Sequence, residues 1–196
     1  WAPRGAEKYL RSANAGERLE ERRFSLDPWV NETTRLVEPD RYIAERETFE
    51  LGEVRFTVSP VGAAHSDADL TLYVEPDRVL FSGDVIFEGR VPFLGDSNTR
   101  NWVSVLERME REQLTALVPG HGSVADDPNA AISLTRRYLA YLRQQMGAAV
   151  SEFIPFSEAY AETDWSAFED LPAFAETNRR NAYQVYLSME AELLGE

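Results

Sequence analysis

Cysteine is absent from this 196-residue chain, which excludes disulfides, thiolate metal sites and cysteine nucleophiles together. The chain also lacks any apolar run close to the roughly 18 residues that span a membrane. Positive charge is scarce: 20 Lys and Arg stand against 34 Asp and Glu, so the formal net charge is −14. A field of that sign repels phosphate backbones and anionic lipids, so we expect neither nucleic acid nor membrane as a partner.

The amino-acid composition indicates a folded domain. Apolar residues make up 43% of the chain and aromatic residues 11%, which is enough for a core and excludes disorder. The length suits one domain or a large piece of one. A chain without cysteine is stable in either redox environment, so the compartment stays open between cytoplasm and periplasm.

Apolar periodicity predicts strands first and helices later. Residues 49–58 alternate around Gly52, and residues 70–81 alternate around a Glu-Pro-Asp-Arg turn, so each segment is a predicted β-hairpin. A charged, mostly exposed helix is predicted before them, over residues 6–23. Strands followed by strand–helix alternation, and then by helices, indicate an α/β or α+β sheet that helices cover.

Helix signals dominate the second half of the chain. Asn98 is a good N-cap for a helix whose apolar stripe is Trp102, Val105, Leu106 and Met109. A short strand over residues 114–118 is predicted to stop at the following Pro-Gly. Asp127 and its proline start another helix, which we expect Gly147 to end. The tail over residues 157–196 is predicted to be helical, with an apolar stripe of Ala182, Val185, Tyr186, Met189 and Leu193.

Three residues with metal-ligating side chains each follow a predicted strand. The chain has two histidines: His65 follows the strand that ends near Val58, and His121 follows the strand at residues 114–118. Between them, Asp84 stands behind a glycine at the end of a third predicted strand. Glycines in these loops let the backbone turn sharply and approach an ion closely. Two imidazoles and a carboxylate suit zinc, manganese or iron(II), so these three residues are the candidate metal ligands.

Three segments carry a resemblance to a known family. They are residues 62–69 (Gly-Ala-Ala-His-Ser-Asp-Ala-Asp), 79–87 (Val-Leu-Phe-Ser-Gly-Asp-Val-Ile-Phe) and 117–122 (Leu-Val-Pro-Gly-His-Gly). In this order and with similar gaps they resemble the second half of the metallo-β-lactamase superfamily, over roughly residues 48–146. Aspartate rather than cysteine at position 84 resembles its glyoxalase II and general metallo-hydrolase branch.

The resemblance implies a dinuclear zinc site, in which manganese or iron can take the place of zinc. His65 would be a ligand of the first metal and His121 of the second, while Asp84 bridges both and is the residue on which catalysis depends. The implied activity is hydrolysis, with a metal-bound hydroxide attacking an ester, thioester, lactam or related bond of a small molecule.

The fold implied by the resemblance is half or more of an αββα sandwich. Residues 1–150 would form the second half of the metallo-β-lactamase-like domain, with one mixed sheet and helices on its outer face. Residues 151–196 would form a C-terminal helical extension of the same domain.

The chain departs from the family in the first half, where a His-x-His-x-Asp-His motif supplies most of the ligands. Two histidines cannot make that motif, so we expect weak or absent metal binding and no hydrolysis by this chain alone. Because residue 1 is Trp, we expect a fragment or processed product with that motif upstream. The missing N-terminal half, a second chain or a second copy would then cover the sheet's inner face, whose apolar residues include some of Phe49, Phe56, Leu70, Leu72, Val79 and Phe81.

Two other interpretations stay open. The chain is a non-catalytic binding or assembly module that keeps the fold with an incomplete metal site, or it is an ordinary acidic α/β domain without metal. Asp67 and Asp69 either orient His65 or belong to a solvated turn. Candidates for holding an anionic substrate group, each otherwise a solvated arginine, are Arg90, Arg179 and Arg180.

Overall fold

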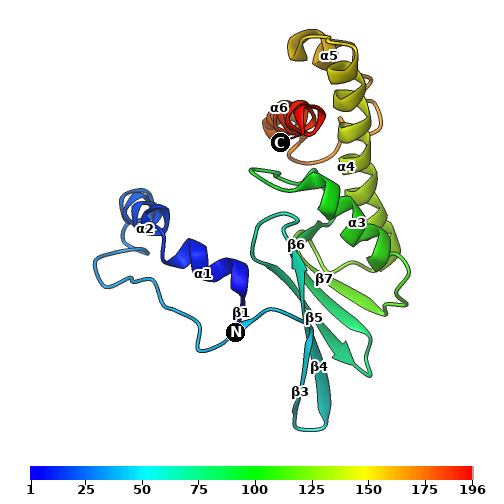
Figure 1. Cartoon of the computed structure of the whole chain (residues 1–196). Helices are drawn as coiled ribbons and strands as arrows, with labels where there is room; N and C mark the ends of the chain where they lie inside the picture. The colour runs from blue at the N-terminus through cyan, green and yellow to red at the C-terminus, as the bar shows by residue number, and fades with distance from the viewer. Residues whose placement is uncertain (196) are drawn as a thin grey trace.

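Figure 1 shows the computed structural model of the protein, which describes residues 1–195. The main sheet has five strands in the order β3-β4-β5-β6-β7. β3 to β6 pair antiparallel and β7 lies parallel to β6, so the sheet is mixed. The strands span Glu47–Leu51 (β3), Val54–Gly62 (β4), Asp69–Glu75 (β5), Val79–Phe87 (β6) and Ala116–His121 (β7). A separate parallel pair joins β1 (Ala2–Pro3) to β2 (Tyr42–Ile43).

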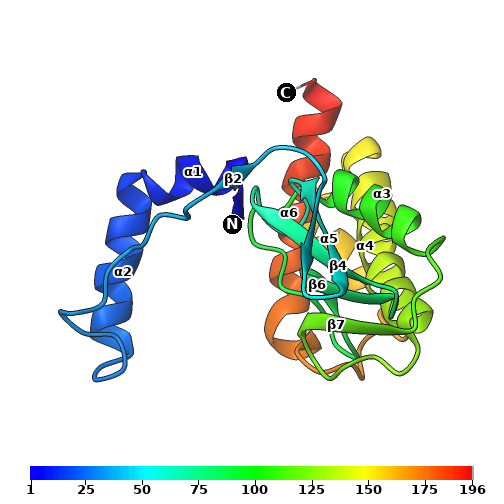
Figure 2. The same cartoon turned by 90° about the horizontal axis from the view of Figure 1, so that it is seen from below.

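The larger helices lie on one side of the main sheet. Figures 1 and 2 show α3 and α4 beside the sheet and α6 crossing α4, whereas α1 and α2 project away from them. The bounds are Arg4–Leu10 (α1), Ala13–Ser25 (α2), Thr99–Met109 (α3), Pro128–Ser151 (α4), Phe156–Glu162 (α5) and Phe174–Leu194 (α6). The predicted α/β class, with one mixed sheet, helices on its outer face and a C-terminal helical extension, is confirmed. No helix within residues 1–195 has the length and apolar character to cross a membrane.

Segments with strong local signals form as predicted. Both hairpins are present, as β3–β4 and β5–β6. Asn98 caps α3, because its side-chain oxygen accepts a hydrogen bond from the Asn101 backbone N–H at 3.0 Å. Asp127 caps α4 in the same way, with the Ala130 N–H donating at 3.0 Å and proline in the first turn. The four apolar residues predicted to form the buried stripe of α3 are all buried.

Several predicted boundaries are wrong. The helix predicted over residues 6–23 is broken at Arg11 and Ser12, where the Ser12 hydroxyl donates to the Tyr9 carbonyl at 2.7 Å. The strand predicted over residues 114–118 runs from Ala116 through the Pro-Gly to His121 instead.

The helical prediction also differs from the structure in α4 and in the tail. α4 does not end at Gly147 but continues to Ser151. A Cβ on that glycine would lie 2.9 Å from the Met189 methyl carbon, so the residue serves the close crossing of α6 rather than a helix end. The tail is two helices separated by residues 163–173, and Leu193 of the predicted stripe is exposed. Glu196 lies outside the described residues.

Both faces of the sheet carry apolar side chains, but the helices cover one of them. On the covered face, Leu80 of β6 and Leu117 of β7 are buried in one cluster with Trp102, Leu106 and Leu139 of the helices. Burial of that cluster removes apolar side chains from water and so stabilises the fold.

The opposite face is built from two neighbouring rows of paired residues. Strand register places Phe49, Phe56, Val74, Val79 and Ala116 in one row, and Val58, Leu72, Phe81 and Val118 in the next. Paired residues in a sheet point to the same face, so this face is apolar on all five strands except at Glu47 of β3, which pairs with Val58. Phe81 remains 41% exposed, and the Trp1 ring packs 5.0 Å from that of Phe49 at one end.

Candidate functional site

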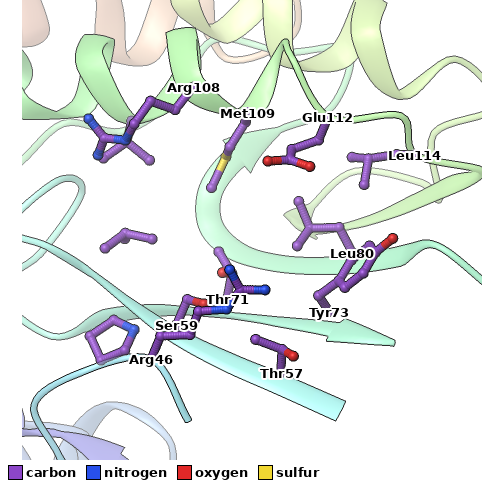
Figure 3. A pocket seen from close by; sticks show the side chains of 13 residues that line it. Arg46, Thr57, Ser59, Thr71, Tyr73, Leu80, Arg108, Met109, Glu112 and Leu114 are labelled. Atoms are coloured by element: carbon purple, nitrogen blue, oxygen red, sulfur yellow. The ribbon is translucent and has the colours of Figure 1, made fainter. Parts of the chain in front are cut away.

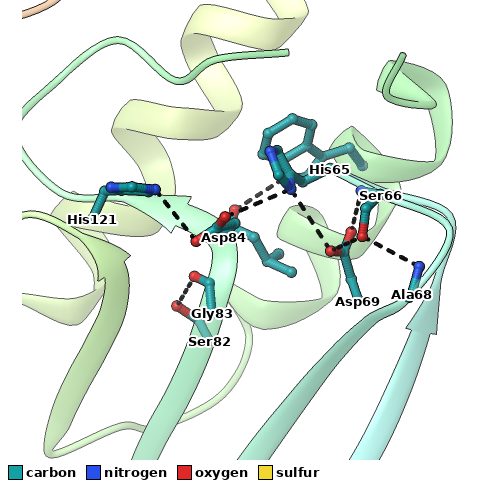
Figure 4. Close-up of polar contacts among 10 residues, drawn as sticks. His65, Ser66, Ala68, Asp69, Ser82, Gly83, Asp84 and His121 are labelled. Atoms are coloured by element: carbon teal, nitrogen blue, oxygen red, sulfur yellow. Dashed lines mark hydrogen bonds and ion pairs between the residues drawn. The ribbon is translucent and has the colours of Figure 1, made fainter. Parts of the chain in front are cut away.

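The structure brings the three candidate ligands together at one edge of the sheet. His65 follows β4, Asp84 lies in β6 and His121 ends β7. Asp84 stands between the two histidines (Figure 4): its Oδ2 is 3.9 Å from Nδ1 of His65, and its Oδ1 is 3.6 Å from Nε2 of His121. Each carboxylate oxygen therefore faces a different imidazole, while the assignment of these residues as ligands stays a prediction.

Asp84 lies within β6, which continues to Phe87, and not at the end of the strand as predicted. The strand is irregular there, because its register with β7 shifts between Phe81 and Gly83 and again between Gly83 and Phe87. Gly83 has a φ of 53°, a left-handed conformation that glycine adopts without steric cost. The bend beside this glycine turns Asp84 out of the regular ladder and toward both histidines.

The two glycines around His121 are explained by close packing. A Cβ on Gly120 would lie 2.0 Å from Oδ1 of Asp84, so any side chain there would displace the carboxylate. Gly122 has a φ of 100°, and a Cβ on it would lie 2.5 Å from the carbonyl oxygen of Glu88. The Pro-Gly-His-Gly segment therefore needs its glycines to bring His121 beside Asp84.

Aromatic rings hold the imidazoles in place. The Phe87 ring stacks on that of His121, with centroids 4.8 Å apart, and lies 5.8 Å from that of His65. Trp102 meets the His65 ring edge-on at 5.6 Å, and its indole N–H donates to the Val85 carbonyl at 2.9 Å. Trp102 is completely buried. The covered core therefore extends up to the histidines and limits how far their rings can turn.

Asp69 and Asp67 have different environments. Asp69 is buried, accepts hydrogen bonds from the Ser66 N–H at 2.8 Å and hydroxyl at 2.7 Å, and has an oxygen 3.9 Å from Nδ1 of His65. Burial works to raise the pKa of Asp69, but the nearby His65 and the Ser66 donors outweigh it and hold that pKa below its ordinary value. Asp67 is exposed. Asp69 is thus the carboxylate near His65, at a separation too long for a direct hydrogen bond. That it orients the His65 ring stays a prediction.

A cavity of about 320 Å³ opens over the three candidate ligands. Arg18 of α2, Arg90 and Thr177 of α6 also line it. Arg18 and Thr177 were not among the predicted site residues. Nothing in the local sequence of α2 or α6 indicates which face of the helix lies beside a loop far along the chain. Arg90 was among the candidates for holding an anionic group.

A separate cavity of about 400 Å³ lies between α3 and the helix-facing side of β4 and β5 (Figure 3). Arg46, Arg108 and Glu112 supply its charged side chains, and no histidine lines it. It therefore lacks the pair of imidazoles that stands beside a carboxylate at the edge of the sheet.

The donor set fits part of a metal centre. Ligand atoms about 2.0–2.2 Å from one zinc ion stand roughly 3.4 Å apart in a tetrahedral site, close to the His121–Asp84 separation and shorter than the His65–Asp84 one. Each pair offers two protein donors, one fewer than a catalytic zinc takes. Within residues 1–195, no group of three or more His, Asp or Glu side chains is ready to hold a metal ion as it stands. The chemistry of the donors fits zinc, and the number of donors does not complete its site.

Comparisons with known proteins agree with this reading of the fold. A family model described as the metallo-β-lactamase superfamily matches residues 5–121. Acyl-coenzyme A thioesterase MBLAC2 of Gallus gallus is 30% identical over 90 residues, which are 43% of this chain and 32% of that protein. The chain therefore spans about a third of the length of the curated relative that it matches.

Two solved structures share the fold at low sequence identity. The stereoselective inverting sec-alkylsulfatase Pisa1 of Pseudomonas sp. superposes with a TM-score of 0.62 at 15% identity, covering 78% of this chain and 27% of that one. An archaeal metallo-β-lactamase superfamily protein of Sulfolobus tokodaii gives a TM-score of 0.52 at 19% identity, covering 70% of this chain and 57% of that one. At such identities the likeness describes the fold alone.

Proposed function

Because this chain belongs to the metallo-β-lactamase superfamily, we propose that His65, Asp84 and His121 are ligands of the metal centre of a hydrolase. One observation carries the proposal: the two oxygens of Asp84 face two different histidines, at 3.9 and 3.6 Å. A carboxylate in that position suits a ligand shared between two ions. Zinc is the metal we favour, and the same donors also suit manganese or iron(II).

The residues of this chain would hold and shape the site. A bound metal supplies Lewis acidity and makes a water nucleophilic near neutral pH. His65 and His121 offer ring nitrogens on either side of Asp84, and Asp69 keeps the His65 ring oriented. Phe87 and Trp102 form an apolar wall behind both rings, which excludes water from one side of the cluster.

The centre would be completed by donors from outside this chain. The sequence has two histidines, and each pair around Asp84 leaves an ion one protein donor short of a catalytic zinc site. We therefore propose that residues 1–196 alone bind metal weakly and do not hydrolyse substrate. A longer protein that contains this chain, a second chain or a second copy would supply the remaining ligands.

The proposed substrate is an ester, a thioester, a lactam or a related small molecule. Among these, thioesters are the first to test, because the curated relative is named an acyl-coenzyme A thioesterase. That relative matches less than half of this chain, so the panel includes the other bond types as well.

The experiment measures metal content and hydrolysis in the full-length protein that contains this chain. Asp84→Ala is expected to lower both, with hydrolysis falling at least about 100-fold, because even residues that only support a metal ligand cost about 10- to 100-fold. Asp77→Ala is the matched control, since Asp77 is an exposed carboxylate in the β5–β6 turn. Circular dichroism checks that both variants are folded.

Three outcomes separate the possibilities. Loss of metal and hydrolysis in Asp84→Ala, but not in Asp77→Ala, supports the proposal. A parent protein that holds no metal, or an Asp84→Ala variant with undiminished activity, contradicts the ligand assignment. Metal that depends on Asp84, without hydrolysis of any compound in the panel, would contradict the proposed substrate class and favour the non-catalytic binding module.

A further inference from the structure

The cavity of about 400 Å³ beside α3 (Figure 3) has hydroxyl side chains along the sheet. Strand register pairs Thr57 of β4 with Tyr73 of β5, and Ser59 with Thr71, on the side of the sheet that faces the helices. Next to Tyr73, the same side of β6 is apolar at Leu80. The helix-facing side of the sheet therefore changes from apolar to hydroxyl-bearing at the place where α3 and the strands leave a cavity.

Three of these hydroxyls have no partner in the fold. The Thr57 hydroxyl lies within hydrogen-bond distance of side chains on both neighbouring strands, at 3.2 and 3.4 Å. Thr71 is 5% exposed, yet its hydroxyl, like those of Ser59 and Tyr73, makes no hydrogen bond among residues 1–195. A buried hydroxyl without a partner costs free energy, and most such groups in native proteins find one. The sheet side of the cavity therefore offers three donors to whatever occupies it.

Two arginines that line the cavity carry charge that no carboxylate of the described chain pairs with. Arg46 stands directly before β3, and Arg108 lies in the last turn of α3. Neither guanidinium forms an ion pair among residues 1–195, whereas Arg179 and Arg180 both stack on aromatic rings. Figure 3 shows Arg46 extending over the strands into the cavity. Both side chains are exposed, so a ligand can reach them from solvent.

The helix side of the cavity is largely apolar. Val105 and Met109 of α3 line it and are 2% and 8% exposed, and Leu114 follows them along the chain. Glu112 is the one carboxylate among the lining residues of the described chain, and Figure 3 shows it on the same side as Met109, across from Arg46. The cavity thus runs from a polar, cationic region beside the sheet to an apolar wall on α3.

Its size and position suit a small molecule that does not reach the candidate metal ligands. The volume of about 400 Å³ lies within the roughly 300–1,000 Å³ of ligand cavities, and it holds about a dozen atoms of water size. None of the described residues lines both this cavity and the one over His65, Asp84 and His121. A ligand here would therefore occupy a second, separate site.

The balance of charges and donors favours an anion. Two guanidiniums and three free hydroxyls can donate hydrogen bonds, and Glu112 is the single charged acceptor. The whole chain carries −14, so an anion-binding site needs such a local excess of positive charge. A carboxylate matches the planar fork of a guanidinium, and an aliphatic body would contact the apolar wall of α3.

We propose that this cavity is a second ligand site, which binds a small carboxylate with an aliphatic body. The carboxylate accepts hydrogen bonds from Arg46 and from the hydroxyls of Ser59 and Thr71. The aliphatic body lies against Val105 and Met109. The proposal does not depend on the metal centre, because the two cavities share no lining residue among residues 1–195.

The first test follows the methionine methyl signals by NMR in the full-length protein that contains this chain, labelled with ¹³C at the methyl groups. The ligands are hexanoate, neutral hexanamide and hexylammonium at constant ionic strength. Met109 lines the cavity, whereas Met146 and Met189 do not, so they serve as internal controls. We expect a saturable shift of the Met109 signal with hexanoate, at least about tenfold weaker binding of hexanamide, and no binding of hexylammonium. Met109→Leu assigns the signal.

The second test uses variants of the donors in the same titration. Arg46→Gln should weaken hexanoate binding about tenfold, because it removes a charge-assisted hydrogen bond. Thr71→Val keeps the shape of the side chain and removes the hydroxyl, so we expect a loss of about 3- to 10-fold. The matched control is Arg137→Gln, at an exposed arginine on α4, and it should bind hexanoate like the unmodified protein.

The outcomes decide the proposal without reference to hydrolysis. A saturable shift at Met109 that is weakened by Arg46→Gln and not by Arg137→Gln supports it. The assignment is wrong if hexanoate gives no saturable shift at Met109, if hexanamide or hexylammonium binds as tightly, or if Arg46→Gln leaves the affinity unchanged. Arg46→Gln replaces an exposed side chain, so its result does not depend on whether Thr71→Val folds.

Discussion

The two faces of the main sheet differ both in composition and in what packs on them. On β4 and β5 the helix-facing side presents Thr57 and Tyr73, whereas the other side presents Phe56 and Val74. Leu80 and Leu117 point to the face that α3 and α4 cover, and both are buried. Phe81, next to Leu80 along the same strand, points to the other face and stays 41% exposed. On β6 and β7, successive pairs are apolar on both faces, Leu80 with Leu117 and Phe81 with Val118, which is typical of strands buried on both sides. Alternation along a strand therefore predicts which face each side chain points to, whereas its burial depends on which helices pack on that face.

The helix-covered core of the sheet is in direct contact with the candidate site. Trp102 links the helix-covered core to His65 through ring contact and to β6 through its hydrogen bond to Val85. The stability of the covered face and the geometry of the histidines are therefore coupled. Substitutions on the two faces should separate these contributions.

The largest expected effect is on the covered face, at Trp102. Trp102→Ala should lower the free energy of unfolding by about 3–5 kcal/mol, because it removes a fully buried side chain and leaves a cavity. Urea denaturation followed by circular dichroism measures the change. Trp29→Ala is the matched control, since that indole is 87% exposed and its loss should cost little. Equal costs for the two variants would contradict the comparison.

A smaller effect is expected at Glu192, which ties α6 to the other helices. Its carboxylate accepts from Arg143 of α4 at 2.9 Å and from Arg100 of α3 at 2.6 Å. The hydrogen bond from Arg143 outweighs desolvation, and together with the charges of both arginines it holds the pKa of Glu192 below its ordinary value. Glu192→Gln should therefore lower the free energy of unfolding at pH 7 by about 1–2 kcal/mol.

The pH dependence of this difference follows from its sign. A depressed carboxyl pKa stabilises the folded state above the ordinary glutamate pKa, and the contribution is lost as the pH falls through the folded value. The gap between the unmodified chain and Glu192→Gln should thus be full at pH 7 and shrink as the pH drops below about 4.5. Urea titrations at several pH values measure it, with exposed Glu107→Gln of α3 as the control. A gap that persists at acid pH would show that packing, not charge, is responsible.

The smallest expected effect is on the open face, at Phe81. Phe81→Thr keeps a residue that favours strands and should lower the free energy of unfolding by less than about 1 kcal/mol, because much of the ring is already in contact with solvent. The same change should reduce the binding of a hydrophobic fluorescent dye, since it removes exposed apolar surface. Dye titration alongside urea denaturation checks both. A cost comparable to that of Trp102→Ala would mean that this face is buried in solution.

Most of the fold could be predicted because its signals are local. The alternation around Gly52, the caps Asn98 and Asp127, and the helical spacing behind Asn98 all concern residues within a few positions of one another. Gly147 was misassigned as a helix end because glycine is ambiguous in sequence. The Met189 side chain that explains it comes from a helix about 40 positions later, and no local pattern contains that information.

The candidate site divides in the same way between local and long-range information. By itself, the sequence determined that two histidines and an aspartate follow or end strands beside glycines, because strand periodicity and turn chemistry act over a few residues. Only the tertiary structure decided that Asp84 stands between both imidazoles, that Asp69 rather than Asp67 lies near His65, and that the Arg90 Nε has no hydrogen-bond partner among residues 1–195. Those outcomes depend on the strand register, on the irregularity of β6 at Gly83 and on the packing of α6. Each of these involves contacts between segments that lie far apart in the chain.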